Sequence, residues 1–365
     1  MKYVIYDYSI QGLTNWSVFL GKDNIKLLDK KEDINLYYFE YNDIEIYYPQ
    51  ASFQLRLPIE TNLENFTLGY YPELNDCKKI ISLHTPLNQN HIDLANELIE
   101  QYKSNSIVVH IQLQGDPQSA TYKNENVKTI TSTFSIEDIG KENIFTDIKL
   151  CIPFFYYKHL LSLVNYDYIN SYENKNPQDK IFMYARRIFE PSSEGVRDRK
   201  YFANKLREFL SEDKYEFGDT FRYEIEGNRI PFGAYHLGNY FDYNQYMFNV
   251  VSESIYSDAP PLTNSNFISE KSMFAILFSN PFFLLANIVI RNIYKDMGIL
   301  FLNDEFDTDD IGNKFEMFCQ FINNSKYEDR FELYKKYKVI QKRNREILLN
   351  YIRNPKLNCL EFLLK

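Results

Sequence analysis

The sequence lacks the short signatures of several common enzyme classes. It contains no glycine-rich phosphate loop, no GxSxG elbow and no HExxH pair. The cysteines are few and scattered, and they form neither a CxxC pair nor a metal-ligand spacing. They are Cys77, Cys151, Cys319 and Cys359. We therefore expect reduced, buried thiols and no bound metal.

An excess of positive charge is also missing. Lysine and arginine number 41 against 50 acidic residues, and the net charge is −9. This balance argues against a protein that coats nucleic acid through its overall charge. It leaves room for a local basic pocket that holds a phosphorylated ligand. The 365 residues, 44% of them hydrophobic, suffice for two domains with sizeable cores.

Neither a signal peptide nor a membrane span is expected. The first residues, MKYVIYDYSIQG, do not have the layout of a secretory signal, so we expect a cytoplasmic protein. The longest apolar stretch, residues 273–290, is interrupted by Ser279, Asn280, Pro281 and Asn287. Asn-Pro in its middle predicts the end of a helix followed by a buried strand.

The first half of the chain has the pattern of a parallel sheet. Residues 2–8 and 78–84 read as strands, and residues 92–104 form an amphipathic helix pattern. Residues 106–113 are nearly all apolar, as in a strand buried on both sides. Strand, helix and strand at this spacing predict a βαβ unit. Further predictions are a short helix at 12–20, mixed strands and loops at 24–70, and strands at 127–135 and 145–155.

The second half repeats the alternation after a polar stretch at 171–180, which we interpret as a linker or domain edge. Gly298 suits the end of a helix. The last charged segment predicts one long helix or a helix pair. Predicted strands are 180–185, 215–219, 245–254, 281–286 and 299–302, and predicted helices are 199–210, 269–280, 288–297 and 327–352.

One segment combines a strand end with a helix start. An apolar strand ends at Glu253, and a loop leads to a helix that opens with Ser269, Glu270 and Lys271. Ser269 is a good N-cap, and Glu270 suits the positive end of the helix dipole. Backbone amides and Lys271 at this place can hold phosphate, and a carboxylate can bind a ribose. An ordinary structural cap is the alternative interpretation.

This segment resembles the donor-binding half of α1,3-fucosyltransferases and of related glycosyltransferase-like proteins encoded by viruses and phages. Those proteins have a strand ending in Glu, then an aromatic residue, Thr/Ser-Glu-Lys, a helix and a short strand introduced by Pro. The resemblance covers about residues 180–310. The residues that carry it are Glu253, Phe267, Ser269, Glu270, Lys271 and Pro281-Phe282-Phe283.

The resemblance implies roles for individual residues. The family has an arginine opening a helix in the pattern Arg-x-x-Phe/Tyr-x-x-x-Leu, which Arg199, Phe202 and Leu206 match. By this likeness Arg199 and Lys271 bind the donor diphosphate, and Glu270 binds the ribose. Ser254 stands where the fucosyltransferases have Asn, so the donor is left open as a GDP- or UDP-sugar.

Other residues have both a functional and an ordinary interpretation. Arg186 and Arg187 follow a strand and can clamp phosphate, or they are surface arginines. Asp116, after the strand at 106–113, is the candidate general base, or part of a plain Asp-Pro turn. His236 lies in an aromatic loop that can touch a sugar, and His110 reads as a core residue. The acidic residues at 304–310 read as a solvated loop.

These observations together predict an α/β protein of two Rossmann-like domains facing each other across a cleft, the arrangement called GT-B. We expect an acceptor-side domain at 1–152, a donor-binding domain at 153–345, and a C-terminal helical tail at 346–365 that packs back. The expected activity is metal-independent transfer of a sugar from a nucleotide-diphosphate sugar to a hydroxyl of a glycan, protein or nucleic acid. The alternatives are a non-catalytic structural relative, such as a virion protein, and a DNA-base glycosyltransferase. A virus-encoded chain would work in the host cytoplasm.

Overall fold

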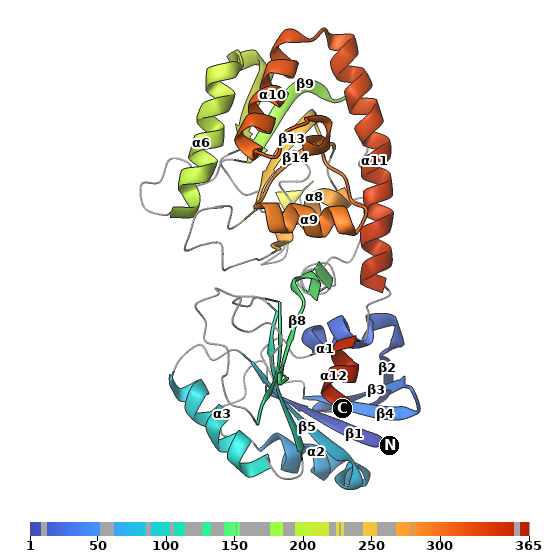
Figure 1. Cartoon of the computed structure of the whole chain (residues 1–365). Coiled ribbons are helices and arrows are strands. Elements are labelled where there is room, and N and C mark those ends of the chain that lie inside the picture. Colours follow the sequence, from blue (N-terminus) through green and yellow to red (C-terminus); the bar gives the residue numbers. More distant parts are fainter. Residues whose placement is uncertain are drawn as a thin grey trace. The chain divides into compact units, whose positions relative to one another are not determined.

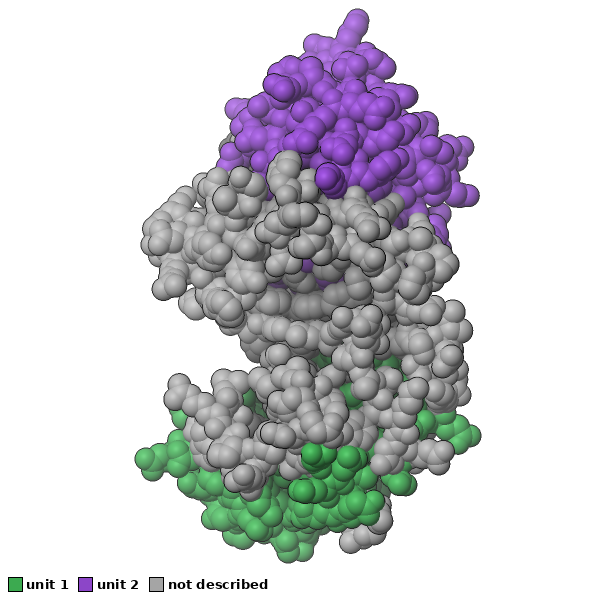
Figure 2. Space-filling model, turned by 90° about the vertical axis from the view of Figure 1, so that its left-hand side faces the viewer, with its two compact units in different colours: residues 1–157, 352–365 green, residues 158–351 purple. Residues whose placement is uncertain are grey.

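The chain divides into two compact units. A computed structural model describes residues 1–8, 13–51, 62–84, 89–102, 106–113, 126–132, 142–150, 152–153, 176–184, 194–218, 224–225, 228–229, 244–253, 268–278, 280–353 and 358–364. Unit 1 comprises residues 1–157 and 352–365, and unit 2 comprises residues 158–351 (Figure 2). The sequence predicts a domain boundary at residue 152 and a separate tail from residue 346. The boundary in the structure lies at residue 157. In the structure, residues 352–365 belong to unit 1.

Unit 1 is built on a sheet of eight strands, in the order β2-β3-β4-β1-β5-β6-β7-β8 (Figure 1). From β4 to β8 all neighbours are parallel, whereas β3 is antiparallel to both β2 and β4. The strands are β1 (Lys2–Asp7), β2 (Lys26–Lys31), β3 (Ile34–Tyr41), β4 (Ile44–Ala51), β5 (Lys78–His84), β6 (Ser106–Gln112), β7 (Lys128–Thr131) and β8 (Ile144–Thr146).

Helices cover both faces of this sheet. Leu63 of α2 (Leu63–Tyr70) and Leu98 of α3 (Gln89–Tyr102) pack with Tyr6 and Ile81 on one face. On the opposite face lie α1 (Leu13–Leu20) and α12 (Asn358–Leu364), where Lys128 Nζ donates to the Phe362 carbonyl at 2.9 Å. The predicted βαβ unit is confirmed as β5, α3 and β6.

The region at 24–70 is more regular than its sequence indicates. Strands β2 to β4 form a meander, and Asn42 and Asp43 turn between β3 and β4 with φ of 46° and 62°. Asparagine and aspartate tolerate this left-handed conformation, which two-residue hairpin turns require. The helix α2 follows, because the Asn62 side chain accepts from the Asn65 amide at 2.9 Å and caps it.

Unit 2 contains a four-stranded parallel sheet in the order β10-β9-β13-β14. Its strands are β9 (Gln178–Tyr184), β10 (Tyr215–Gly218), β13 (Tyr246–Ser252) and β14 (Phe282–Leu285), and a short hairpin of β11 (Glu224–Ile225) and β12 (Asn228–Arg229) stands apart. Its helices are α6 (Glu194–Phe209), α8 (Glu270–Phe278), α9 (Ile288–Asp296), α10 (Ile311–Asn324) and α11 (Tyr327–Arg353). The strands predicted at 180–185, 215–219, 245–254 and 281–286 are confirmed.

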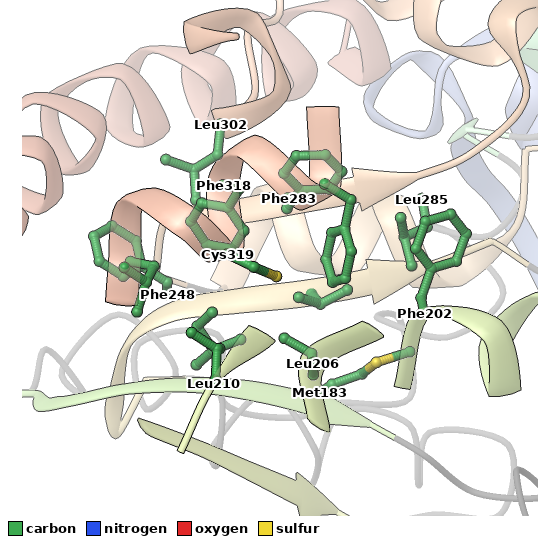
Figure 3. Close-up of a cluster of buried hydrophobic side chains, with 14 of the residues drawn as sticks. Met183, Phe202, Leu206, Leu210, Phe248, Phe283, Leu285, Leu302, Phe318 and Cys319 are labelled. Atoms are coloured by element: carbon green, nitrogen blue, oxygen red, sulfur yellow. The ribbon is translucent and has the colours of Figure 1, made fainter. Parts of the chain in front are cut away.

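Aromatic side chains fill the core of unit 2 between the sheet and the helices α6 and α10 (Figure 3). Phe283 stacks on Phe318 with ring centroids 5.5 Å apart, and Phe202 meets Phe315 edge-on at 5.0 Å. Such pairs add stability beyond the area that they bury. On the other face of β14, Phe282 contacts Phe301. Much of the aromatic content therefore serves packing.

The prediction of a strand at 299–302 is wrong. Residues Leu302–Glu305 form a 3-10 helix instead. The Asn303 side chain pairs with the Leu284 backbone, accepting from its N–H at 2.7 Å and donating to its carbonyl at 2.9 Å. This side chain takes the edge of β14 that a further strand would need. Asn344 of α11 likewise bonds both backbone groups of Leu300. The strand predicted at 145–155 is also shorter, since β8 ends at Thr146 and a 3-10 helix (Ile148–Leu150) follows.

Three further expectations hold. Gly298 ends α9 with a φ of 83°, where a side chain would be strained. The charged segment after residue 326 forms one helix of 27 residues. Cys77, Cys319 and Cys359 are free and buried, and Cys151 lies outside the described residues. In the described part of the chain, no helix has the length and apolar character to cross a bilayer.

An ion pair joins α11 to the sheet of unit 2. Arg330 is 5% exposed and donates from Nε to Asp179 Oδ1 at 2.8 Å and from Nη2 to Oδ2. It also donates to the carbonyls of Ile322 and Ser325. Burial acts to raise the pKa of Asp179, but the hydrogen bonds and charge of Arg330 outweigh it and hold that pKa below its ordinary value.

Arg330→Ala is therefore expected to destabilise unit 2 by about 2–3 kcal/mol at pH 7, because it leaves the partly buried Asp179 carboxylate with only Lys214, at 3.5 Å, as a cationic partner. A carboxylate with a lowered folded pKa stabilises above its unfolded pKa, near 3.9, and this stabilisation fades as pH falls further. The deficit should accordingly shrink below about pH 4. Urea unfolding followed by circular dichroism measures it, with exposed Lys335→Ala of the same helix as the control. A deficit that is equal at pH 7 and pH 3 would contradict the assignment.

Candidate functional site

The predicted site lies at the carboxyl end of β13, a central strand of the unit 2 sheet. The strand pairing continues to Glu253, whose amide donates to the Leu285 carbonyl of β14 at 2.9 Å. Parallel α/β sheets bind ligands at this edge, where the strands end and the helices begin. The helix α8 starts beside Glu253, as the sequence predicts.

Glu253 anchors the start of α8 through hydrogen bonds. Its carboxylate is 1% exposed and accepts from the Ser269 amide at 3.1 Å and from the hydroxyls of Ser269 and Ser272. The Ser272 hydroxyl also lies 2.6 Å from the Tyr294 hydroxyl of α9. One buried carboxylate thus connects β13, α8 and α9. We call Glu253, Ser269, Ser272 and Tyr294 the Glu253 cluster.

The N-cap prediction for Ser269 is confirmed, because its Oγ accepts from the Lys271 amide at 3.2 Å. The expectation of open amides at this helix start is wrong for the two amides of Ser269 and Lys271. Both already bond within the chain, to Glu253 and to the Ser269 hydroxyl. A phosphate at this position would therefore depend on side chains more than on these amides.

The buried cluster leaves Lys271 at the surface of the helix start. Ser269 and Ser272 are fully buried, while Lys271 is half-buried. Glu270 is the first residue of α8, and only its backbone is described. The arrangement can present one cation beside the carboxyl edge of the sheet. Glu253 and Ser269 lie inside, where they shape the site.

For most of the other predicted site residues the structure gives the backbone only, or they lie outside the described residues. Arg199 lies in α6, but the expectation that it opens the helix is wrong, since α6 begins at Glu194. Only the backbone of Arg199 is described. Phe202 and Leu206 of its motif are buried in the core, 2% and 0% exposed. The residues Arg186, Arg187, Phe267, His236 and Asp116 lie outside the described residues. His110 is fully buried in β6.

Sequence reasoning missed Ser272 and Tyr294. Ser272 follows Ser269 by three residues, and residues three apart share a helix face, so this spacing was the available signal. Tyr294 gave no local signal, because only the packing of α9 against α8 brings it to the cluster.

The acidic residues at 304–310 make hydrogen bonds that stabilise the local backbone and the start of α10. Asp304 accepts from the Phe301 amide at 2.7 Å, and Asp310 caps α10 by accepting from the Asn313 amide at 2.7 Å. Glu305 accepts from Lys336 and from the Tyr337 hydroxyl. Among the residues that the structure describes, no group of three or more His, Cys, Asp or Glu gathers in metal-binding geometry.

Comparison with known proteins adds little to this geometry. Neither a protein-family model nor a curated protein matches the chain. Among solved structures, the G domain of the T. maritima FeoB iron transporter matches 36% of this chain and 86% of its own length. The two are 12% identical and superpose with a TM-score of 0.25, which is too low to indicate a shared fold or function.

Proposed function

We propose that the chain is a glycosyltransferase whose unit 2 binds a nucleotide-diphosphate sugar at the carboxyl end of β13. The observation that supports this most is the Glu253 cluster, which fixes the start of α8 against the end of a buried parallel strand. The motif Ser269-Glu270-Lys271 then opens the helix, as in the donor-binding half of the fucosyltransferases. In the proposal Lys271 and Arg199 bind the diphosphate, and Glu270 binds the ribose.

The proposed reaction needs no metal. Cationic side chains would stabilise the negative charge on the departing nucleoside diphosphate, which other classes of glycosyltransferase leave to a divalent ion. A carboxylate of unit 1, with Asp116 as the candidate, would take the proton from the acceptor hydroxyl as that oxygen attacks the sugar. The proposal includes the GT-B arrangement, with acceptor and donor held by different units. The donor is a GDP- or UDP-sugar.

Binding of the donor is expected to raise the melting temperature of unit 2. A ligand at one hundred times its dissociation constant stabilises by about 2.7 kcal/mol, which corresponds to about 5 °C or more for a unit of this size. Scanning calorimetry with UDP-, GDP- and CMP-sugars measures this shift. Lys271→Ala should abolish it, because the substitution removes the cation at the helix start.

The matched control is Lys295→Ala, an exposed lysine at the far end of α9 that should leave the shift unchanged. If no nucleotide sugar stabilises the wild-type chain, the glycosyltransferase proposal fails, and a non-catalytic relative becomes the better interpretation. If Lys271→Ala keeps the full shift, donor binding lies elsewhere.

A further inference from the structure

A row of polar side chains crosses three strands at the carboxyl edge of the unit 1 sheet. Asp7 is the last residue of β1 and stands in register with Ser82 of β5. On its other side, the Tyr48 hydroxyl of β4 donates to Asp7 Oδ2 at 3.0 Å. Asp7 and Ser82 are both fully buried. In-register residues of neighbouring strands share a face, so the three side chains lie together.

The face that they occupy is the one covered by α1 and α12. Ser82 is in register with Val109, and Val109 with Lys128, whose Nζ donates to the end of α12. Tyr6, the residue before Asp7, points to the opposite face and packs in the cluster that contains α2 and α3.

The strand β1 differs from both of its neighbours in where the chain goes next. It leads to α1 on one face, whereas β4 leads to α2 and β5 leads to α3 on the other face (Figure 1). Such a change of side between adjacent parallel strands opens a crevice beyond their carboxyl ends, and α/β sheets bind their ligands there. Asp7, Tyr48 and Ser82 lie at the base of this position.

The Ser82 hydroxyl at this position has free hydrogen-bonding capacity within the described part of the chain. Its Oγ is buried and finds no hydrogen-bond partner among the residues that the structure describes. A buried hydroxyl without a partner is unfavourable unless a bound molecule completes it. The indole Nε1 of Trp16 is a second buried donor that has no partner in the described ranges, and it belongs to α1, the helix to which β1 leads.

We infer that unit 1 carries a binding site for a neutral sugar hydroxyl at the carboxyl ends of β4, β1 and β5. A hydroxyl group both accepts from Ser82 and donates to the Asp7 carboxylate, as no purely anionic ligand does. The negative charge of Asp7 disfavours a phosphate here. The site itself follows from the topology of unit 1, whereas the identification of its ligand as the acceptor sugar rests on the proposed function.

The test uses the full chain and four probes: the methyl glycosides of glucose, galactose, mannose and N-acetylglucosamine. Saturation-transfer difference NMR titrations measure their dissociation constants. Ser82→Ala should weaken the binding of the preferred glycoside about five- to tenfold, the loss of one hydrogen bond. Because the Ser82 hydroxyl makes no hydrogen bond to the described parts of the chain, this variant should unfold like the wild type.

The matched control is Ser106→Ala. Ser106 begins β6 at the opposite edge of the sheet, and its buried hydroxyl likewise has no partner in the part of the chain that is described. This variant should bind the glycoside with unchanged affinity. Asp7→Asn, which keeps the shape of the side chain, should weaken binding at least as much as Ser82→Ala.

Two results would overturn the inference. One is the absence of binding by all four glycosides to the wild-type chain. The other is equal affinity in the Ser82 and Ser106 variants, which would mean that Ser82 holds an ordered water only. Donor binding is measured on the same samples. Lys271→Ala should remove the nucleotide-sugar signal and keep the glycoside signal, so failure of the donor site is distinguishable from failure of this one.

Discussion

Ending the chain after Arg353 is expected to destabilise unit 1 by about 5 kcal/mol, because the deletion removes α12. Cys359, Leu360 and Leu363 of this helix are at most 1% exposed, and each buried leucine contributes about 1.5–3 kcal/mol. A domain is stable by only about 5–15 kcal/mol in total. The loss therefore approaches the whole stability of the unit.

The contacts of α12 show what its deletion would remove from unit 1. Phe362 meets Phe145 of β8 with ring centroids 5.7 Å apart. Lys128 Nζ donates to the carbonyls of Phe362 and Leu363 at 2.9 Å and 3.0 Å, which satisfies acceptors that a helix end leaves open. Burial lowers the pKa of Lys128. Without α12 the Lys128 ammonium would lose these acceptors, and the apolar face beneath the helix would meet water.

The single tryptophan of the chain makes this measurable. Trp16 is fully buried in α1 of unit 1, so its fluorescence reports the unfolding of this unit. In a urea titration the truncated chain should lose the Trp16 signal at much lower urea. Glu361→Ala is the control. Glu361 is exposed and accepts from the Tyr41 hydroxyl at 3.1 Å, so its removal should change stability by no more than about 0.5 kcal/mol. An unchanged midpoint for the truncated chain would show that α12 is dispensable.

Local signals explain which parts of the fold were predictable. The helix α3 and the strand β6 follow from an amphipathic period and an unbroken apolar run, both of which lie within one segment. Asn280-Pro281 separates α8 from β14 where the residue preference before proline requires it. In these cases the neighbouring residues carry the information, and the tertiary structure agrees with it.

The errors arise where distant side chains decide the outcome. Residues 299–302 are apolar enough for a strand, but Asn303 occupies the edge of β14 and Asn344 bonds the Leu300 backbone. Asn344 lies 44 residues away from Leu300 in the chain. A pattern read within a short window of sequence cannot show that a distant side chain pairs with these backbone groups in place of a strand.

In the candidate site, too, local features were predictable and features that depend on distant residues were not. The position of Glu253 at a strand end and the N-cap role of Ser269 were both readable from the sequence. The direction of the Glu253 carboxylate was not, because its burial depends on Ser272 and on Tyr294 of a later helix. Glu253, which the resemblance places among the donor-binding residues, therefore anchors the helix that carries Lys271.

Glu253→Ala is expected to destabilise unit 2 by about 3 kcal/mol or more. The substitution removes the acceptor of the buried Ser269 amide and Ser269 hydroxyl, and each such orphan donor costs about 1–3 kcal/mol. The Ser272 hydroxyl loses Glu253 but keeps the Tyr294 hydroxyl as a partner. Calorimetry should show a lower transition for unit 2, while the Trp16 fluorescence transition of unit 1 stays in place. Ser252→Ala, one residue earlier and only partly buried, is the control.

Comparing Glu253→Ala with Glu253→Gln separates two roles that Glu253 can have, anchoring α8 and contacting the donor. If it only fastens α8, Glu253→Gln, which keeps one acceptor oxygen, should recover part of the stability, and donor affinity should recover in step with it. If the carboxylate itself contacted the donor, Glu253→Gln would lose affinity while unit 2 regained its melting temperature. The burial of Glu253 at 1% and its bonds to Ser269 and Ser272 favour the first outcome. Donor titrations of the wild type and both variants below the melting temperature of each decide between them.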